Sequence, residues 1–492
     1  MLNVLIGSRL PQKYRKYFGV PEQFETWKLA DTGDTQLGVA AADWLERHEG
    51  HCGVYRLDLG LDALSARLAL IDAAERSIDI QSYLIRDDVS GTLVAMKLIE
   101  AADRGVRVRL LMDDALTEPI DAGLLSLDDH DNIGVRVFNP FPRRRSRLIS
   151  FIAYFNILNR RMHNKSFTVD NQVTIVGGRN LADEYFQTGR AEEFIDEDVL
   201  AIGPVVDAVS DGFDEYWNTR EAIPISVFGK KVRRPFRQRD DSHPQQVNGL
   251  LIDQLLAGRL QLTAAEVDLV LDHPDKIRRI LNRPSSEASQ YLLDLAATAT
   301  DELIIVSPYF VPQKQGVEFF RGLVRHGVRV VIITNSLAST NHSSVHAAYA
   351  RYRKPLLREG IELYELRHLL AAHDADHGLE ESARLTLHSK VVVVDGRRCF
   401  VGSFNLDPRS LYINTEMGVS VRSSGFATMM ADSILETLPK WAYRITLGPN
   451  EVLQWKYLSG GRERVVEREP HTSVWRRFTT WLMSWFPIES QM

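Results

Sequence analysis

Two copies of one pattern of histidine, lysine and aspartate stand out in the sequence, because these residue types together can carry out phosphoryl chemistry. The first copy reads MHNKSFTVDNQVTIVGGRN from Met162, and the second reads LHSKVVVVDGRRCFVGSFN from Leu387. One such match can arise by chance, but two in register indicate a duplicated site. Five pairs of identical residues lie 225 positions apart: His163 and His388, Lys165 and Lys390, Asp170 and Asp395, Gly177 and Gly402, Asn180 and Asn405.

Paired histidines suit a reaction that breaks and remakes a phosphodiester bond. A neutral imidazole can attack phosphorus to give a phosphohistidine, while a second, protonated imidazole donates to the departing alkoxide. The lysines and asparagines of both copies would hold the phosphate oxygens, so we expect no metal and no cofactor. The alternative for a single His-Lys pair is a half-buried strand with two polar residues. The duplication therefore favours one active site assembled from both copies.

The residues after each His-Lys pair predict a β-hairpin. The runs SFTV and VVVV are rich in strand formers, and the Asp-Asn and Asp-Gly dipeptides that follow are typical hairpin turns. Side chains two apart on a strand share a face, so each histidine is expected beside its lysine. Asp170 and Asp395 fall at the turns. We group them with the catalytic residues, although turn formation and local hydrogen bonding are the favoured interpretation.

The duplication extends to the elements that must position the motifs. Helical stretches lead into ERSIDIQSYLI and RGVRVRLLMDD in the first half, and into TDELIIVSPYF and HGVRVVIITN in the second. Such alternation predicts parallel strands joined by crossover helices, hence an α/β fold made of two homologous units. We expect these segments: 1–59, an N-terminal extension; 60–225, the first unit; 226–285, a linker; 286–445, the second unit; 446–492, an amphipathic C-terminal tail.

Composition limits the remaining possibilities. The chain has 492 residues, 44% of them hydrophobic, which is enough for two packed units. Its net charge of −6 argues against a nucleic-acid partner. Two cysteines, Cys52 and Cys399, exclude a disulfide framework and a multi-cysteine metal cluster. We expect neither a signal peptide nor a spanning helix, so that any membrane contact is peripheral.

The two motifs resemble those of the phospholipase D superfamily, in which H-x-K-x4-D is followed by a small pair such as Gly-Gly or Gly-Ser. The resemblance covers roughly residues 60 to 445 and implies a pseudo-twofold arrangement in which both motifs meet between the halves. It implies that His163 attacks and that His388 acts as acid and base. The family also has a carboxylate after each motif that orients a histidine. Glu416 fits this position, and Asp196 fits it less closely, with a solvated acidic loop as the alternative.

Longer stretches resemble bacterial cardiolipin synthases, the C type in particular: SPYFVP, HAAYARYRKPLLREGIELYEL, GSFNLDPRSLYINTEMG and WFPIE. This resemblance implies transfer of a phosphatidyl group from phosphatidylglycerol or phosphatidylethanolamine to phosphatidylglycerol, at the bacterial inner membrane. A hydrolytic phospholipase D that releases phosphatidic acid is the alternative, and a nuclease is a more distant one. An inactive scaffold would be expected to have lost a motif residue, and neither copy has lost one.

Two segments are candidates for peripheral membrane contact. Arg143 to Met162 is an apolar stretch bracketed by arginines that could bind anionic head groups. Val474 to Phe486 carries aromatic residues at helical spacing, with tryptophans suited to the membrane interface. Packing against the protein core is the alternative for both segments.

Two further features have weaker functional interpretations. His342 and His346 have the spacing of zinc ligands on a helix, but no glutamate lies between them, so pocket lining or packing is favoured. The basic stretch Gly229 to Gln246 is interpreted as a solvated linker, and contact with anionic lipid is the alternative.

Overall fold

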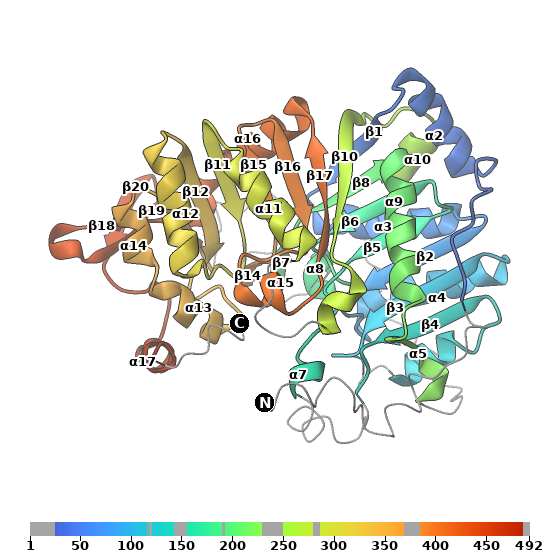
Figure 1. Ribbon diagram of the computed structural model, residues 1–492, viewed down its shortest axis with the longest axis horizontal. Helices are drawn as coiled ribbons and strands as arrows, with labels where there is room; N and C mark the ends of the chain where they lie inside the picture. The colour runs from blue at the N-terminus through green and yellow to red at the C-terminus, as the bar shows by residue number, and fades with distance from the viewer. Residues whose placement is uncertain are drawn as a thin grey trace.

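The computed structural model describes residues 25–115, 117, 121–141, 155–188, 192–228, 249–278, 286–368 and 384–485. Two α/β halves lie side by side, each with helices packed against a mixed sheet (Figure 1). The predicted α/β fold of two homologous units is confirmed.

The strands of the first half are β1 (Cys52–Leu57), β2 (Ser77–Ser82), β3 (Arg107–Asp113), β4 (Ile133–Phe138), β5 (Ser166–Val169), β6 (Val173–Gly177), β7 (Glu192–Ile195), β8 (Asp198–Ile202) and β9 (Ala222–Pro224). Those of the second half are β10 (Thr263–Leu271), β11 (Glu302–Val306), β12 (Arg329–Asn335), β13 (Glu362–Leu366), β14 (Arg384–Leu387), β15 (Val391–Val394), β16 (Arg398–Gly402), β17 (Met417–Arg422), β18 (Ala442–Leu447), β19 (Leu453–Ser459) and β20 (Arg462–Val466).

The helices before residue 260 are α2 (Gln36–Arg47), α3 (Gly60–Ala73), α4 (Val89–Asp103), α5 (Asp121–Leu127), α7 (Phe155–Leu158), α8 (Asp183–Phe186), α9 (Pro204–Trp217) and α10 (Leu250–Leu256), with the 3-10 turn Ile225–Val227. Those after it are α11 (Glu287–Ala297), α12 (Gln313–Arg325), α13 (Ser343–Ala350), α14 (Arg353–Arg358), α15 (Pro408–Tyr412), α16 (Ser424–Trp441) and α17 (Val474–Met483), with the 3-10 turns Pro274–Arg278 and Pro449–Glu451.

Both halves repeat one strand order. The first sheet runs β9-β4-β3-β2-β5-β6-β8-β1, and the second runs β18-β13-β12-β11-β15-β16-β17-β10. Strands β2, β3 and β4 are parallel, as are β11, β12 and β13, and helices connect them as the sequence predicts. Strands β19 and β20 extend the second sheet beyond the repeat.

Two strand pairings join the halves. Strands β1 and β10 are antiparallel, with Cys52 opposite Ala265, so the two sheets continue into each other. These strands come from the segments expected to be an extension and a linker. Strands β7 and β14 form a separate parallel ribbon in which Ile195 lies opposite Leu387. The ribbon matters for function because His388 directly follows one of its strands and Asp196 directly follows the other.

The cores explain why these pairings hold. The parallel strands carry runs of aliphatic side chains, valine, leucine or isoleucine, and are buried on both faces, as strands covered by helices must be. One cluster of buried side chains draws on both sheets and on α16, so the halves share part of their core. Examples are Val54 and Val199 from the first half, and Val401 and Val419 from the second. Burial of such a shared core fixes the halves relative to each other.

Each motif forms the predicted hairpin, β5–β6 in the first half and β15–β16 in the second. The central turn residues have positive φ angles: 51° and 49° at Asp170 and Asn171, and 52° and 58° at Asp395 and Gly396. Two successive positive φ angles are the requirement of a type I′ turn, which the Asp-Asn and Asp-Gly dipeptides satisfy.

The turn aspartates bind backbone in both halves. The Asp170 carboxylate accepts from the N–H groups of residues 75–77, at 2.7–3.0 Å. The Asp395 carboxylate accepts in the same way from residues 300–302, at 2.8–3.0 Å. Residues 75–77 lead into β2 and residues 300–302 lead into β11. Each carboxylate therefore binds its hairpin to the start of the neighbouring strand.

We predict that Asp170→Ala lowers the free energy of unfolding by about 2–4 kcal/mol, because buried N–H donors lose a charged acceptor. Chemical denaturation followed by circular dichroism measures this loss. Asp170→Asn, which keeps one acceptor oxygen, should lose less, and Asp432→Ala on the exposed face of α16 is the control. Unchanged stability together with lost turnover would instead place Asp170 in the chemistry.

Candidate active site

The two motif histidines lie where the halves meet. His163 and Lys165 belong to the segment that leads into β5, and His388 and Lys390 to the one that leads into β15. The backbone N–H of His163 donates to the carbonyl of Thr415 at 2.9 Å, and that of His388 donates to the carbonyl of Ile195 at 2.8 Å. Each motif is therefore hydrogen-bonded to the opposite half.

A carboxylate from the opposite half also orients each imidazole. Nδ1 of His163 lies 2.8 Å from Oε2 of Glu416, and Nδ1 of His388 lies 2.6 Å from Oδ2 of Asp196. Asp196 is buried and does not belong to a solvated loop. A carboxylate at Nδ1 favours the tautomer with its proton on that nitrogen, which leaves Nε2 for chemistry.

Hydroxyl groups hold the Glu416 carboxylate in place. Ser403 donates through Oγ to Oε2 at 2.6 Å, and Ser410 donates to Oε1 at 2.8 Å. The Asp196 carboxylate accepts instead from the backbone N–H of Glu197, at 2.9 Å. The repeated motifs thus use different supports for the same task.

Aromatic rings pack against both imidazoles. Tyr83 meets the His163 ring edge-on, with centroids 5.2 Å apart. Phe194 stacks on the His388 ring at 5.3 Å with an angle of 7° between planes, and Tyr185 meets its edge at 5.0 Å. Such contacts restrict rotation of the imidazoles.

Sequence analysis did not identify these aromatic residues or Ser410. The duplication could not have revealed them, because Tyr185 occupies the position that Ser410 has in the second copy. These residues are recognised by their contacts across the interface, and sequence spacing does not predict such contacts.

The two lysines are buried beside the histidines. Nζ of Lys165 donates to the His163 carbonyl at 2.7 Å, and Lys390 contacts both the carbonyl and Nδ1 of His388, the latter at 2.8 Å. Burial, together with the charge of Lys390, lowers the pKa of Lys165 to about 7. Burial lowers the pKa of Lys390 to about 8, although Asp196 and Glu416 oppose the change.

The same electrostatics keep the imidazoles neutral and the carboxylates charged. Burial lowers the pKa of His163, and burial with the charge of Lys390 lowers that of His388 to about 3. Burial opposes ionisation of Asp196, yet Lys390 and His388 hold its pKa well below the usual range. The pKa of Glu416 is lowered in the same way by His163. Two neutral imidazole rings therefore lie beside two lysines whose charged form a bound anion would stabilise.

The two asparagines point unsatisfied oxygens into the interior. Oδ1 of Asn180 and Oδ1 of Asn405 are both buried, with no hydrogen-bond partner among the described residues. Nδ2 of Asn180 donates to the hydroxyl of Tyr185 at 2.8 Å, and Ser410 supports the backbone N–H of Asn405 at 3.3 Å. A pair of buried amide groups with spare bonding capacity calls for a polar ligand.

The structure does not bring every predicted residue into this site. Asp170 and Asp395 lie at the far ends of the hairpins, where they bind backbone N–H groups. His346 is buried, with Nε2 2.6 Å from Arg353 and 3.4 Å from Glu469, which is a packing environment. Within the described ranges no three side chains of the metal-ligating types gather.

The segment Arg143 to Met162 lies partly outside the described residues, which resume at Phe155. Leu158 is buried, Arg160 donates to the carbonyl of Ile277 at 3.1 Å, and Arg161 pairs with Asp113 at 3.1 Å. The arginines at this end of the segment bind the protein itself, which corrects the expectation that they meet head groups. The stretch Gly229 to Gln246 lies wholly outside the described residues.

Comparison with known proteins gives the family. The profile described as "Cardiolipin synthase, PLD-like domain" matches residues 68–217 and 292–437. This chain belongs to that phospholipase-D-like family. It is 39% identical over 469 residues to cardiolipin synthase C of Escherichia coli K12, across 92% of this chain and 99% of the relative. It is 26% identical to cardiolipin synthase A of Pseudomonas putida F1, across 77% of this chain and 66% of the relative.

A solved structure shows the same fold at low sequence identity. The phosphatidylserine synthase of Haemophilus influenzae Rd KW20 superimposes with a TM-score of 0.55 and 13% identity, covering 82% of this chain and 91% of that one. The predicted superfamily and enzyme class, a phosphatidyltransferase, are confirmed by the matches together.

The lysine pKa values predict how activity depends on pH. Because the pKa of Lys165 is about 7 and that of Lys390 about 8, raising the pH from 6 to 9 removes the charges that attract the phosphate. We expect kcat/KM on a short-chain phosphatidylglycerol to fall across this range, since it reports the free enzyme. Lys165→Arg keeps its charge and should flatten the profile. A flat wild-type profile would contradict this electrostatic assignment.

Proposed function

We propose that this enzyme makes cardiolipin by a double displacement through a phosphohistidine, with phosphatidylglycerol as acceptor and phosphatidylglycerol or phosphatidylethanolamine as donor. One observation carries the proposal. The two imidazoles are each oriented at Nδ1 by a buried carboxylate of the opposite half, beside two buried lysines. Membership of the cardiolipin synthase family supplies the substrate class.

In the first step Nε2 of His163 attacks the donor phosphorus, and an N–P bond forms as the P–O bond to the head-group alcohol breaks. His388 gives its proton to the departing oxygen, so glycerol or ethanolamine leaves neutral at that oxygen. Glu416 accepts the hydrogen bond of His163 Nδ1–H and stabilises the positive charge that develops on the ring. The assignment of attack to His163 follows the family resemblance.

In the second step a glycerol hydroxyl of phosphatidylglycerol replaces the alcohol. His388 takes the hydroxyl proton, the oxygen attacks phosphorus, and the N–P bond breaks to release cardiolipin and free His163. The pKa of His388 is about 3 without substrate. A bound phosphodiester offsets the charge of Lys390 and thereby raises the pKa of His388. The same imidazole can then serve as acid in the first step.

The lysines and asparagines of both motifs bind the non-bridging oxygens in this proposal. The two ends of an asparagine amide are interchangeable by a half-turn of the group. If the Asn180 amide turns, Oδ1 accepts from the Tyr185 hydroxyl and Nδ2 is left to donate to phosphate. Fixed donors of this kind stabilise the charge that develops during transfer.

Water in place of the lipid hydroxyl would give a hydrolytic phospholipase D, and the same residues would serve it. The matched relatives are named as synthases, which favours the lipid acceptor. The acceptor is therefore the point that an assay must decide.

We further propose that α17 holds the enzyme at the membrane surface. No described helix is long and apolar enough to cross a bilayer. On α17 and just beyond it, Trp475 and Trp485 are 71% and 70% exposed, with Phe478 and Trp481 between them at centroid distances of 5.2–6.0 Å. An exposed row of large aromatic side chains suits the boundary between head groups and acyl chains.

The position of α17 fits this role. Arg476 donates to the carbonyl of Thr340 at 2.9 Å, in the loop that follows the carboxyl end of β12. In Figure 1, α17 lies at the lower side of the molecule, next to α13 and on the same side as α7. Docking through α17 would therefore bring this side of the protein to the lipid.

Lipid analysis by mass spectrometry tests the reaction. Purified enzyme incubated with phosphatidylglycerol, with and without phosphatidylethanolamine, should form cardiolipin as its main product. His163→Ala and His388→Ala should each lose turnover by at least about 1,000-fold, because the cycle loses its nucleophile or its proton carrier. His326→Ala, at an exposed position after α12, is the control. Phosphatidic acid without cardiolipin would make water the acceptor, and near-normal turnover by either variant would refute the paired-histidine mechanism.

Vesicle flotation tests the role of α17. Replacing Trp475, Trp481 and Trp485 by alanine removes exposed apolar area, so binding to phosphatidylglycerol vesicles should weaken by about tenfold or more. Turnover of a short-chain, dispersed substrate should stay unchanged. Trp27→Ala removes a tryptophan of similar exposure, 58%, remote from α17 in sequence, and should have no effect. Unweakened binding of the triple variant would exclude α17 as the membrane contact.

A further inference from the structure

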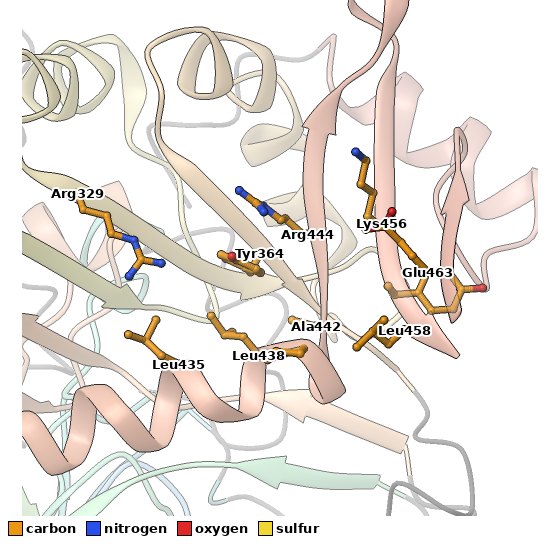
Figure 2. A pocket seen from close by; sticks show the side chains of 11 residues that line it. Arg329, Tyr364, Leu435, Leu438, Ala442, Arg444, Lys456, Leu458 and Glu463 are labelled. Atoms are coloured by element: carbon orange, nitrogen blue, oxygen red, sulfur yellow. The ribbon is translucent and has the colours of Figure 1, made fainter. Parts of the chain in front are cut away.

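The outer part of the second sheet contains a hollow of about 400 Å³ that the proposed reaction does not use. Its walls come from the strands β12, β13, β18, β19 and β20 and from the last turns of α16 (Figure 2). The volume lies within the range of small-molecule sites. The strands contribute positive charge and α16 contributes apolar side chains.

Two positively charged residues occupy paired positions on neighbouring strands at this hollow. Arg444 of β18 lies directly opposite Lys456 of β19. Like charges directly opposite each other on neighbouring strands repel, and an anion between them would offset this repulsion. Figure 2 shows Arg444 beside Tyr364, with Lys456 on the neighbouring strand.

Within the part of the chain that the structure describes, Glu362 acts on this pair electrostatically, since its pKa is lowered by its hydrogen bond with Arg329 and, to a smaller extent, by the charge of Arg444. Neither Arg444 nor Lys456 has an ion pair or a side-chain hydrogen bond there, and Glu463, which also lines the hollow, makes none with them. Arg329 at the rim differs, since it pairs with Glu302 and Glu362 at 2.7 Å. The opposed pair therefore has no ion-paired carboxylate among the described residues and presents two cationic groups to an anionic ligand.

The opposite wall is hydrocarbon. Leu435 and Leu438 of α16 line it, and Leu458 of β19 adds a side chain that is 46% exposed. At the carboxyl end of α16, Arg367 donates to the carbonyl of Lys440 at 2.8 Å and offsets part of the negative charge of that helix end. A ligand with an anionic and an apolar part matches both walls.

We propose that this hollow binds a phosphate-bearing amphiphile, with its phosphate between Arg444 and Lys456 and its hydrocarbon against Leu435, Leu438 and Leu458. Phosphate suits the pair because arginine donates to it in a fork and lysine adds a compact charge. The ligand class is inferred from the side chains that line the hollow and does not depend on the reaction at the histidines. An anionic phospholipid and a soluble phosphate share this head-group chemistry.

Isothermal titration calorimetry of the full chain tests the proposal, with two probes: dihexanoyl phosphatidic acid below its micelle concentration, and inorganic phosphate. Wild type should bind the phosphatidic acid at two sites, the catalytic one and this one. R444Q/K456Q should lose one site, with its affinity lowered by about tenfold or more, since two charged donors are removed. Turnover of phosphatidylglycerol at the wild-type rate shows that this variant is folded, whatever product it makes.

Two variants define the site further. R464Q removes a neighbouring positive charge whose cross-strand partner is Tyr457, so it should keep both sites. L458N should weaken phosphatidic acid several-fold and leave phosphate unchanged, which identifies a lipid as the ligand. Equal binding of both probes, with L458N affecting neither, would overturn the amphiphile in favour of soluble phosphate. A single site in wild type, or two sites retained in R444Q/K456Q, would overturn the proposal altogether.

Discussion

The exchange of carboxylates between the halves is the interaction on which the rest of the site depends. Glu416 of the second half holds His163, and Asp196 of the first half holds His388. Neither half alone can therefore fix its own imidazole. A shift of about 1 Å between the halves would break both hydrogen bonds at once, and a reaction that needs two oriented rings is sensitive to such a shift.

The fold provides the rigidity that this exchange requires. The β1–β10 pairing continues one sheet into the other, the β7–β14 ribbon ends at Asp196 and His388, and buried side chains from both sheets share one core. All three join the two halves. Burial has an electrostatic consequence as well, because it lowers the pKa of Lys165 to about 7 and that of Lys390 to about 8. An anion bound in the site would therefore stabilise the charged forms of both lysines.

The halves have diverged where the duplication allows it. The strand order and the turn aspartates are repeated, since both satisfy backbone requirements that are the same in each half. The supports of the carboxylates differ, with hydroxyl groups of Ser403 and Ser410 on Glu416 and a backbone N–H on Asp196. The two imidazoles consequently have different surroundings.

The sequence by itself determined the duplicated α/β units, the hairpins with their Asp-Asn and Asp-Gly turns, and the His-Lys pairs, because these depend on local spacing and on strand and turn preferences. It indicated Glu416 and Asp196 as carboxylates that orient histidines, but not which histidine each one orients. Only the tertiary structure decided that each carboxylate crosses to the opposite half, that Tyr185 and Phe194 enclose His388, and that Arg160 and Arg161 turn inward. Those features depend on contacts between residues up to 253 positions apart, and such contacts leave no periodic trace in the chain.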